Sequence, residues 1–343
     1  MNVLIIINNV PDYKNKFIEK LASHCELTVV AEKNKTYDVV TERNGYSYIE
    51  LETVSFKFFN IQKGLRKHIG NKKYDVIICS WNIRYIDRVI LFLLSSKRRS
   101  KWIWWGHIYG KSDNDIIARI RRFMLNKASG ILVYSPLIKE QLDNEKIDAN
   151  IISFNNSEVS VRDFRVAKWN DDKFLKILFV GRYQTRKRLD RLIDLMYQFS
   201  HIKVRLIGPG MTMKFGWINH DRLELKDKVN NNKLDKDFSW CDIVVSPGHL
   251  GLLVMNSARY GKPILVSSTD LHAPEVSIAY ESKQYFLDFD NPEDVKSMFN
   301  ITLLNRETLR EKAKMLQEIA REKYNIEYMV KCHVMMLEII NKQ

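Results

Sequence analysis

Short apolar runs alternate with longer amphipathic segments along most of the chain. The runs in the first half have the length and continuity of strands buried on both faces of a parallel sheet. They cover residues 3–8, 27–31, 75–79, 102–106, 131–134 and 150–154. The segments between them, such as 14–23, have the length of crossover helices. The pattern predicts a doubly wound α/β domain.

This pattern is interrupted at residues 158–173, which are polar and lack apolar periodicity. Strand-like runs then resume at 175–180, 204–207, 243–246 and 264–267, and the chain ends in long helical segments. We therefore predict two Rossmann-like domains that face a central cleft. Their expected bounds are 1–160 and 174–343, with a linker over 161–173.

The length of 343 residues fits two such domains better than one. No apolar run reaches the roughly 18 residues of a membrane-spanning helix, and the first run is too short for a signal peptide. The four cysteines are scattered, without a Cys-x-x-Cys pair, which is typical of reduced thiols. We expect a cytoplasmic protein.

Positive charge is concentrated in one quarter of the chain. The formal net charge is +14, and residues 51–127 hold 17 Lys and Arg against 5 Asp and Glu. Basic and large apolar residues are interleaved there, over 55–70 and over 97–105. The candidate residues of this basic face are Lys97, Arg98, Arg99, Trp102, Trp104, Trp105, Arg121 and Arg122.

Basic residues mixed with large apolar ones are typical of a surface that binds an anionic membrane. Solvated helix faces are the alternative interpretation. No nucleic-acid-binding motif accompanies the charge, so nucleic acid is not an expected partner.

The clearest chemical motif lies over residues 175–192, which read LKILFVGRYQTRKRLDRL. A buried strand leads into Gly181 and Arg182, and Lys187 follows five residues later, where a helix is expected to begin. Ligands of open α/β sheets bind outside the carboxyl ends of strands, and a helix amino terminus there favours phosphate. Arg and Lys add donors for a diphosphate.

This strand followed by G-R-x4-K resembles the GT4-type nucleotide-sugar glycosyltransferases, which have the GT-B fold. The resemblance implies that Gly181, Arg182 and Lys187 bind the diphosphate of the donor, the last two as catalytic groups. The alternative is that Arg182 and Lys187 lie on a solvated helix start.

A second stretch, DIVVSPGHLGLLVMNSARYGKPILVSS from Asp242, is similar to the same family's strand, glycine-rich loop and helix. The resemblance implies that Gly251 and Leu252 approach the donor. The family carries two glutamates eight positions apart here, whereas this chain has Gly248 and Asn256. Asn256 retains hydrogen-bonding capacity toward ribose hydroxyls, and Gly248 offers only its backbone.

Replacements for the lost carboxylate are sought in the next loop. Glu275 is a candidate for a sugar hydroxyl and His272 for a phosphate or hydroxyl, although Pro274-Glu275 also fits an ordinary helix start. The resemblance also points to His107 at the reacting sugar and Asn9 at the acceptor. Asp288-Phe289-Asp290 matches a metal-binding D-x-D, but the following Asn-Pro-Glu-Asp is typical of a helix entry, so no metal is expected.

The resemblance implies a retaining hexosyltransferase without cofactor that moves a sugar from a nucleotide diphosphate. Residues 1–160 would bind the acceptor and 174–343 the nucleotide sugar. A basic acceptor domain suits a polyprenyl-diphosphate-linked saccharide at the inner face of the plasma membrane, in polysaccharide or O-antigen assembly. Two alternatives stay open: a catalytically silent protein that binds a nucleotide sugar or partner glycosyltransferase, and a soluble enzyme with a non-lipid acceptor.

Overall fold

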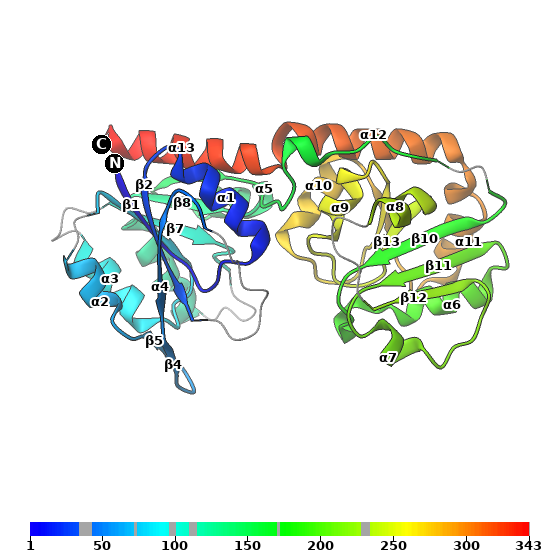
Figure 1. The fold of residues 1–343 in the computed structure, drawn as a ribbon, viewed down its shortest axis with the longest axis horizontal. Coiled ribbons are helices and arrows are strands. Elements are labelled where there is room, and N and C mark those ends of the chain that lie inside the picture. Colours follow the sequence, from blue (N-terminus) through cyan, green and yellow to red (C-terminus); the bar gives the residue numbers. More distant parts are fainter. Residues whose placement is uncertain are drawn as a thin grey trace. The chain divides into compact units, whose positions relative to one another are not determined.

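The computed structural model describes residues 1–33, 43–71, 74–95, 101–109, 115–169, 172–227 and 234–342. The chain divides into two compact units (Figure 1). Unit 1 comprises Met1–Glu158 together with Ile326–Gln343, and unit 2 comprises Val159–Asn325.

Unit 1 is built on a seven-stranded parallel sheet of order β3-β2-β1-β6-β7-β8-β9. Its strands are β1 (Asn2–Ile6), β2 (Glu26–Glu32), β3 (Ser47–Leu51), β6 (Val76–Ser80), β7 (Lys101–Gly106), β8 (Gly130–Val133) and β9 (Asn150–Ser153). The central strands are almost wholly apolar because both of their faces are covered by helices.

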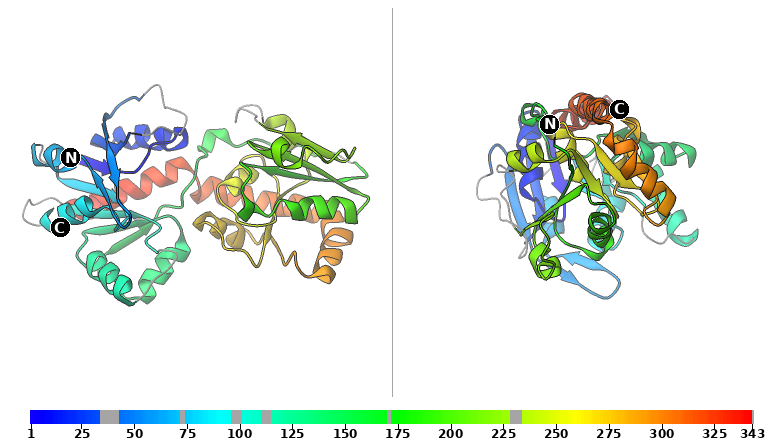
Figure 2. Two further views of the ribbon diagram at one scale, coloured as in Figure 1. Left: turned by 90° about the horizontal axis from the view of Figure 1, so that it is seen from below. Right: turned by 90° about the vertical axis from the view of Figure 1, so that its right-hand side faces the viewer.

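Two layers of helices enclose this sheet, and each buries its own cluster of apolar side chains. One layer is α1 (Asp12–Ala22) with α13 (Ile326–Asn341). The other consists of α2 (Leu65–Asn71), α3 (Ile86–Ser95), α4 (Asp115–Asn126) and α5 (Pro136–Asn144). The antiparallel hairpin β4 (Thr53–Ser55) and β5 (Asn60–Gln62) projects from the body of unit 1 (Figures 1 and 2).

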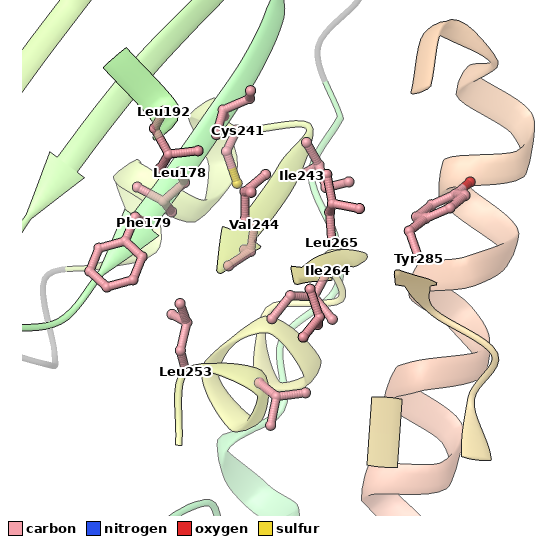
Figure 3. Close-up of a cluster of buried hydrophobic side chains, with 14 of the residues drawn as sticks. Leu178, Phe179, Leu192, Cys241, Ile243, Val244, Leu253, Ile264, Leu265 and Tyr285 are labelled. Carbon is pink, nitrogen blue, oxygen red and sulfur yellow. The ribbon is translucent and has the colours of Figure 1, made fainter. Parts of the chain in front are cut away.

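Unit 2 has a six-stranded parallel sheet of order β12-β11-β10-β13-β14-β15. Its strands are β10 (Leu175–Val180), β11 (Ile202–Ile207), β12 (Leu223–Lys226), β13 (Ile243–Ser246), β14 (Ile264–Ser267) and β15 (Tyr285–Leu287). Its α-helices are α6 (Asp190–Gln198), α7 (Met211–Phe215), α8 (Asp235–Trp240), α9 (Leu253–Arg259), α10 (Ser277–Glu281), α11 (Pro292–Asn300) and α12 (Arg306–Lys323). Figure 3 shows part of the core, with Leu178, Val244 and Leu265 on neighbouring strands.

The last helix returns to the first unit, so the expected second-domain range of 174–343 ends too late. Residues of α13 such as Met329 and Met336 pack into the core that also contains Val3 and Phe17. The backbone N–H of Ser157 donates to the Met329 sulfur at 3.2 Å. The apolar face of α13 is therefore satisfied by unit 1, while the helix before it, α12, packs on α9 and α10 of unit 2.

The sequence prediction of two doubly wound α/β domains is confirmed in its fold class. Trp102, Trp104 and Trp105 lie on β7 and are each only 1% exposed, which agrees with the predicted buried strand over 102–106. They therefore do not contribute to the basic face that the charge pattern suggested. None of the described helices has the length and apolar character needed to cross a bilayer.

Candidate functional site

The candidate site lies at the carboxyl ends of β10 and β13 in unit 2. The chain passes from β10 to β11 on one side and later places β13 on the other side of β10. This reversal of strand order is the topological switch point at which open α/β sheets bind ligands.

The loop after β10 carries the first candidate residues at this point. The Gly181 N–H donates to Ile207 O at 2.8 Å, which continues the ladder one residue past the strand. A Cβ added to Gly208 would lie 2.1 Å from the Gly181 carbonyl oxygen, so the two loops approach as closely as backbones allow. Arg182 follows with an exposed side chain and no partner among the described residues. Its guanidinium is available for an anionic ligand.

Lys187 ends a separate 3-10 turn, Thr185–Lys187. It therefore lies before α6 and not at the opening of that helix, where the sequence analysis placed it. Arg188 follows in the left-handed conformation, with φ of +51°, and α6 begins only at Asp190. The Lys187 Nζ donates to His249 O at 2.7 Å. Burial and the neighbouring Arg186 lower the pKa of Lys187 to about 8, while Glu275 opposes them.

The packing around Gly248 explains why the loop after β13 lacks the glutamate that the resemblance led us to expect at this position. A Cβ on Gly248 would lie 2.5 Å from Arg186 O and 2.7 Å from the Lys187 carbonyl carbon. The His249 N–H also donates to Arg186 O at 2.9 Å. The loops after β10 and β13 are thus hydrogen-bonded to each other, and a glutamate side chain at position 248 would force them apart.

The remainder of this loop leaves space above its backbone. A Cβ added to Gly251 would meet nothing within 4 Å, and no positive φ requires glycine there. Leu252 and Asn256 follow half-buried at the start of α9 and on its first turn. Neither the backbone conformation nor packing within the chain requires glycine at position 251. A ligand that approaches the backbone closely would require it.

His272 joins the loop after β14 to the loop after β13, which corrects the prediction that it contacts a phosphate or hydroxyl. Its Nδ1 accepts from the Leu250 N–H at 3.1 Å, and its Nε2 lies 2.8 Å from Ser267 O. These partners require a neutral ring protonated on Nε2, so both nitrogens are occupied. Burial is the main reason that the pKa of His272 is lowered.

Glu275 lies on the 3-10 turn Pro274–Val276 and is only 5% exposed. Its charge raises the pKa of Lys187, so the two side chains lie within electrostatic range of one another. The candidate carboxylate is thus a buried residue whose charge acts on the candidate diphosphate-binding lysine.

An ion-pair network centred on the buried Arg191 supports these loops. Arg191 on α6 donates to Pro247 O at 2.6 Å, to Asp270 at 2.9 Å and to Asp290 at 2.5 Å. Asp290 is the last residue of the D-x-D sequence, and Asp288 accepts from its backbone N–H at 2.9 Å. Within the described ranges, no group of three or more His, Cys, Asp and Glu side chains is arranged to hold a metal ion.

His249 is the residue of this site that the sequence did not single out. Its Nδ1 lies 2.6 Å from Leu271 O, which makes Nδ1 the protonated nitrogen, and its carbonyl accepts from Lys187. Burial, Arg186 and Lys187 lower its pKa. The sequence offered only a weak signal, a histidine in the loop directly after a buried strand.

The unit 1 candidates lie at the carboxyl end of the other sheet. His107 follows β7 as an exposed residue, but its ring is partly covered by Tyr134, the ring centroids being 4.6 Å apart. Partial burial, with a contribution from Lys14, lowers its pKa. Asn9 is half-buried in the loop after β1.

The expected basic face of unit 1 is changed by the structure. Arg121 is only 5% exposed, because it pairs with Glu145 at 3.3 Å and lies over the Tyr109 ring. Arg121 therefore stabilises the interior of unit 1 and is not available for contact with a partner at the surface. Arg122 is exposed as expected. Lys97, Arg98 and Arg99 lie outside the described residues.

Comparisons with known proteins agree with this architecture. Residues 161–323 match the family model described as "Glycosyl transferases group 1". A sucrose-phosphate synthase from Thermosynechococcus elongatus is similar over 100% of both chains, with 13% identity and a TM-score of 0.71. HepE from Anabaena, solved with UDP, has 12% identity and a TM-score of 0.73 over 98% of this chain and 100% of its own.

A glycosyltransferase from Rickettsia africae is similar over 99% of both chains, with 11% identity and a TM-score of 0.73. No curated protein sequence matches the chain significantly. The two parallel sheets and the returning C-terminal helix define the GT-B fold, and together with the family match they support a GT-B glycosyltransferase. The residues that match the family model, 161–323, lie within unit 2 and span nearly the whole of it.

Proposed function

We propose that this protein is a retaining, metal-independent GT4-type glycosyltransferase that moves a sugar from a nucleotide diphosphate to a lipid-linked saccharide. One observation carries the proposal. An exposed Arg182 and a Lys187 tied to the opposite loop lie at the switch point of unit 2, beside open space over Gly251. Two cations and free backbone at this point suit a diphosphate ester.

In the proposed reaction, the bond between the anomeric carbon and the diphosphate oxygen breaks as the acceptor oxygen bonds to the same carbon. The acceptor's proton passes to the departing phosphate oxygen on the same face, which gives retention. Arg182 and Lys187 stabilise the negative charge that develops on the leaving group. This step requires no enzyme nucleophile and no metal ion.

The sugar and ribose need other groups, because Gly248 has no room for a carboxylate. We assign the sugar hydroxyl to Glu275, which lies within electrostatic range of Lys187. Asn256 is the proposed partner of the ribose hydroxyls. In unit 1, His107 is the proposed contributor to the sugar site, and Asn9 to the acceptor site.

The proposed acceptor is a polyprenyl-diphosphate-linked saccharide at the inner face of the plasma membrane, within cell-surface polysaccharide or O-antigen assembly. The concentration of positive charge over residues 51–127 supports this assignment. An acceptor of this kind also requires the protein to work at a membrane surface without spanning it.

A thermal-shift screen against nucleotide diphosphate sugars tests the donor half of the proposal. UDP sugars come first, because HepE was solved with UDP-glucose and another similar chain, from E. coli, with UDP-2-fluoro glucose. A donor at one hundred times its dissociation constant should stabilise the protein by about 2.7 kcal/mol. Loss of that shift in Arg182→Ala would assign it to the unit 2 site, and no shift with any donor would contradict the proposal.

A second candidate function is a catalytically silent protein that binds a nucleotide sugar or a partner glycosyltransferase. The packing of Gly248 against Arg186 and Lys187 favours it, since the usual carboxylate cannot be restored there. A transfer assay with the donor found above separates the two. Binding without turnover on any lipid-linked or soluble saccharide would favour the silent protein.

A further inference from the structure

Two helices of unit 1 expose apolar stripes to solvent. On α3, Ile86, Ile90 and Leu93 are 39%, 40% and 48% exposed. On α4, the exposed residues are Ile116, Ile120 and Phe123, at 68%, 46% and 52%. Both sets have the spacing i, i+4, i+7, which places each on one side of its helix.

These stripes are additional to the faces that hold the fold together. α3 buries Leu91 and Phe92 against the sheet, and α4 buries Met124 and Leu125. Scattered exposed apolar residues are ordinary, but two stripes of helical period are not. We call these six residues the apolar surface of unit 1.

The two stripes point the same way from the sheet. α3 connects β6 to β7, and α4 connects β7 to β8, so both cover the same face of one parallel sheet. The outward sides of helices in one layer look away from that sheet together. The stripes therefore form parts of a single surface.

The hairpin β4–β5 extends this surface. It is fastened to the start of α3, since the Asn60 N–H donates to Arg84 O at 2.7 Å and the Gln62 N–H donates to Asp87 at 2.9 Å. Its turn exposes Phe56 and Phe58, at 48% and 76%. Figure 1 shows the hairpin as a projection from unit 1.

The charges around the apolar surface have one predominant sign. On the described parts of 52–95 and 115–127, the exposed basic residues are Lys57, Lys63, Arg66, Lys67, Arg84, Arg119, Arg122 and Lys127. The exposed acidic residues there are Glu52, Asp75 and Asp115. Glu52 pairs with Lys63, so the remaining imbalance is positive.

We propose that this surface, made of the α3 and α4 stripes and the β4–β5 hairpin, docks the protein onto an anionic lipid bilayer. Apolar side chains flanked by Arg and Lys match a membrane interface, where the rings and aliphatic chains enter the acyl boundary and the cations meet headgroups. The proposal deepens the acceptor half of the proposed function, on which it rests, by naming the residues that meet the lipid. It does not depend on donor binding.

A second copy of the chain fits this surface less well. A two-fold interface would bring the same positively charged patch onto itself, with Arg119 and Arg122 of both copies facing one another. Unit 1 also has a groove of about 550 Å³ between α1 and α13, but it contains both signs of charge, with Lys20 paired to Glu327 at 3.1 Å. Of these two features, the apolar surface of unit 1 is the one whose surrounding charge is complementary to anionic lipid.

Vesicle flotation of the full chain tests the proposal. Vesicles of phosphatidylcholine with about 30 mol % phosphatidylglycerol should bind the protein at about 0.05 M salt and release most of it at about 0.5 M. Ile120→Ser with Phe123→Ser should weaken the partition at least about tenfold. Arg119→Gln with Arg122→Gln should weaken it about fivefold for each charge removed.

Met335→Ser is the matched control, because Met335 is 41% exposed on α13, in the layer on the other face of the sheet. It should bind vesicles as the wild type does. Equal binding by the stripe variants and Met335→Ser would overturn the proposal. So would a wild-type dimer that the stripe variants convert to monomer without any vesicle binding.

The donor-induced thermal shift should be the same in all of these variants. Lost flotation with a retained shift would therefore support the docking surface alone. If the wild type floats with vesicles but shows no donor-induced thermal shift, the donor proposal is wrong and the docking surface is still supported.

Discussion

Each unit has a buried arginine close to the switch point of its sheet, but the partners of that arginine differ between the two units. In unit 2, Arg191 below the switch point is paired with the carboxylates of Asp270 and Asp290. In unit 1, Arg88 on α3 is 0% exposed below the switch point between β1 and β6. It donates to Asn8 at 2.9 Å and to Ser80 at 2.7 Å, both neutral.

This difference teaches how each unit uses its charge. Unit 2 neutralises the internal cation and presents two others, Arg182 and Lys187, toward the loops where a ligand would bind. Unit 1 keeps its switch-point cation inside, where it fastens the loops after β1 and β6 and stacks on Tyr85 at 3.9 Å from the ring centroid. At both switch points the arginine has an internal role, and its partners are carboxylates in unit 2 and neutral groups in unit 1.

The largest expected effect comes from breaking the ion pair of unit 2. Arg191→Met should lower the free energy of unfolding by about 3–5 kcal/mol, because it leaves Asp270 partly buried without its partner. Urea denaturation followed by circular dichroism measures this loss. The double variant Arg191→Met, Asp270→Asn is the control, and it should recover a large part of the stability. Equal losses in the single and double variants would mean that Asp270 is not the cause.

The next effect concerns turnover and follows from the proposed function. Arg182→Ala should reduce kcat by about two orders of magnitude or more, since it removes a donor from the developing diphosphate charge. Arg186→Ala is the matched control, because Arg186 is also exposed on the next turn but donates to Gln184 at 2.9 Å. Steady-state transfer kinetics measure both. Similar losses in the two variants would indicate general electrostatics and not a specific contact.

A smaller effect is expected at the matching position of unit 1. Arg88→Met should cost about 1–3 kcal/mol, because the acceptors that lose a donor are neutral. Asp87, whose pKa burial raises and the charge of Arg88 helps to lower, keeps its hydrogen bond from the Gln62 N–H. The same urea denaturation provides the comparison with Arg191→Met. A cost equal to or above that of Arg191→Met would break the contrast between the two switch points.

Much of this architecture could be predicted from apolar runs, but not all of it. The continuous runs of β1, β6, β7, β10 and β13 were recognisable because both faces of those strands are buried. The edge strands β3, β12 and β15 were missed, and β12 shows why, since Leu223–Lys226 is half-buried and partly polar. Edge strands have one unpaired side and tolerate such sequences.

The location of a candidate residue was predictable where it follows directly from a strand. Gly181, Arg182 and Gly251 lie in the loops after β10 and β13 as expected, and their roles stay predictions. The roles of His272 and Arg121 depend on partners distant in the sequence, such as Leu250 and Glu145. No spacing of residues in the sequence predicts these contacts. The return of α13 to unit 1 was unpredictable for the same reason, because an amphipathic pattern does not say which core it meets.

The smallest expected effect is a pH dependence that separates Lys187 from the permanently charged Arg182. The pKa of Lys187 is lowered to about 8, so the side chain is mostly charged at pH 7 and mostly neutral at pH 9. Donor capture needs the charged form, so kcat/KM of the wild type should fall about tenfold from pH 7 to pH 9. A bound diphosphate stabilises the ammonium, so kcat should begin to fall only at higher pH than kcat/KM. In Lys187→Arg the guanidinium stays charged throughout, and kcat/KM should stay flat over this range. Persistence of the wild-type fall in Lys187→Arg would assign the titration to another group and remove Lys187 from the set of cations that unit 2 presents to its donor.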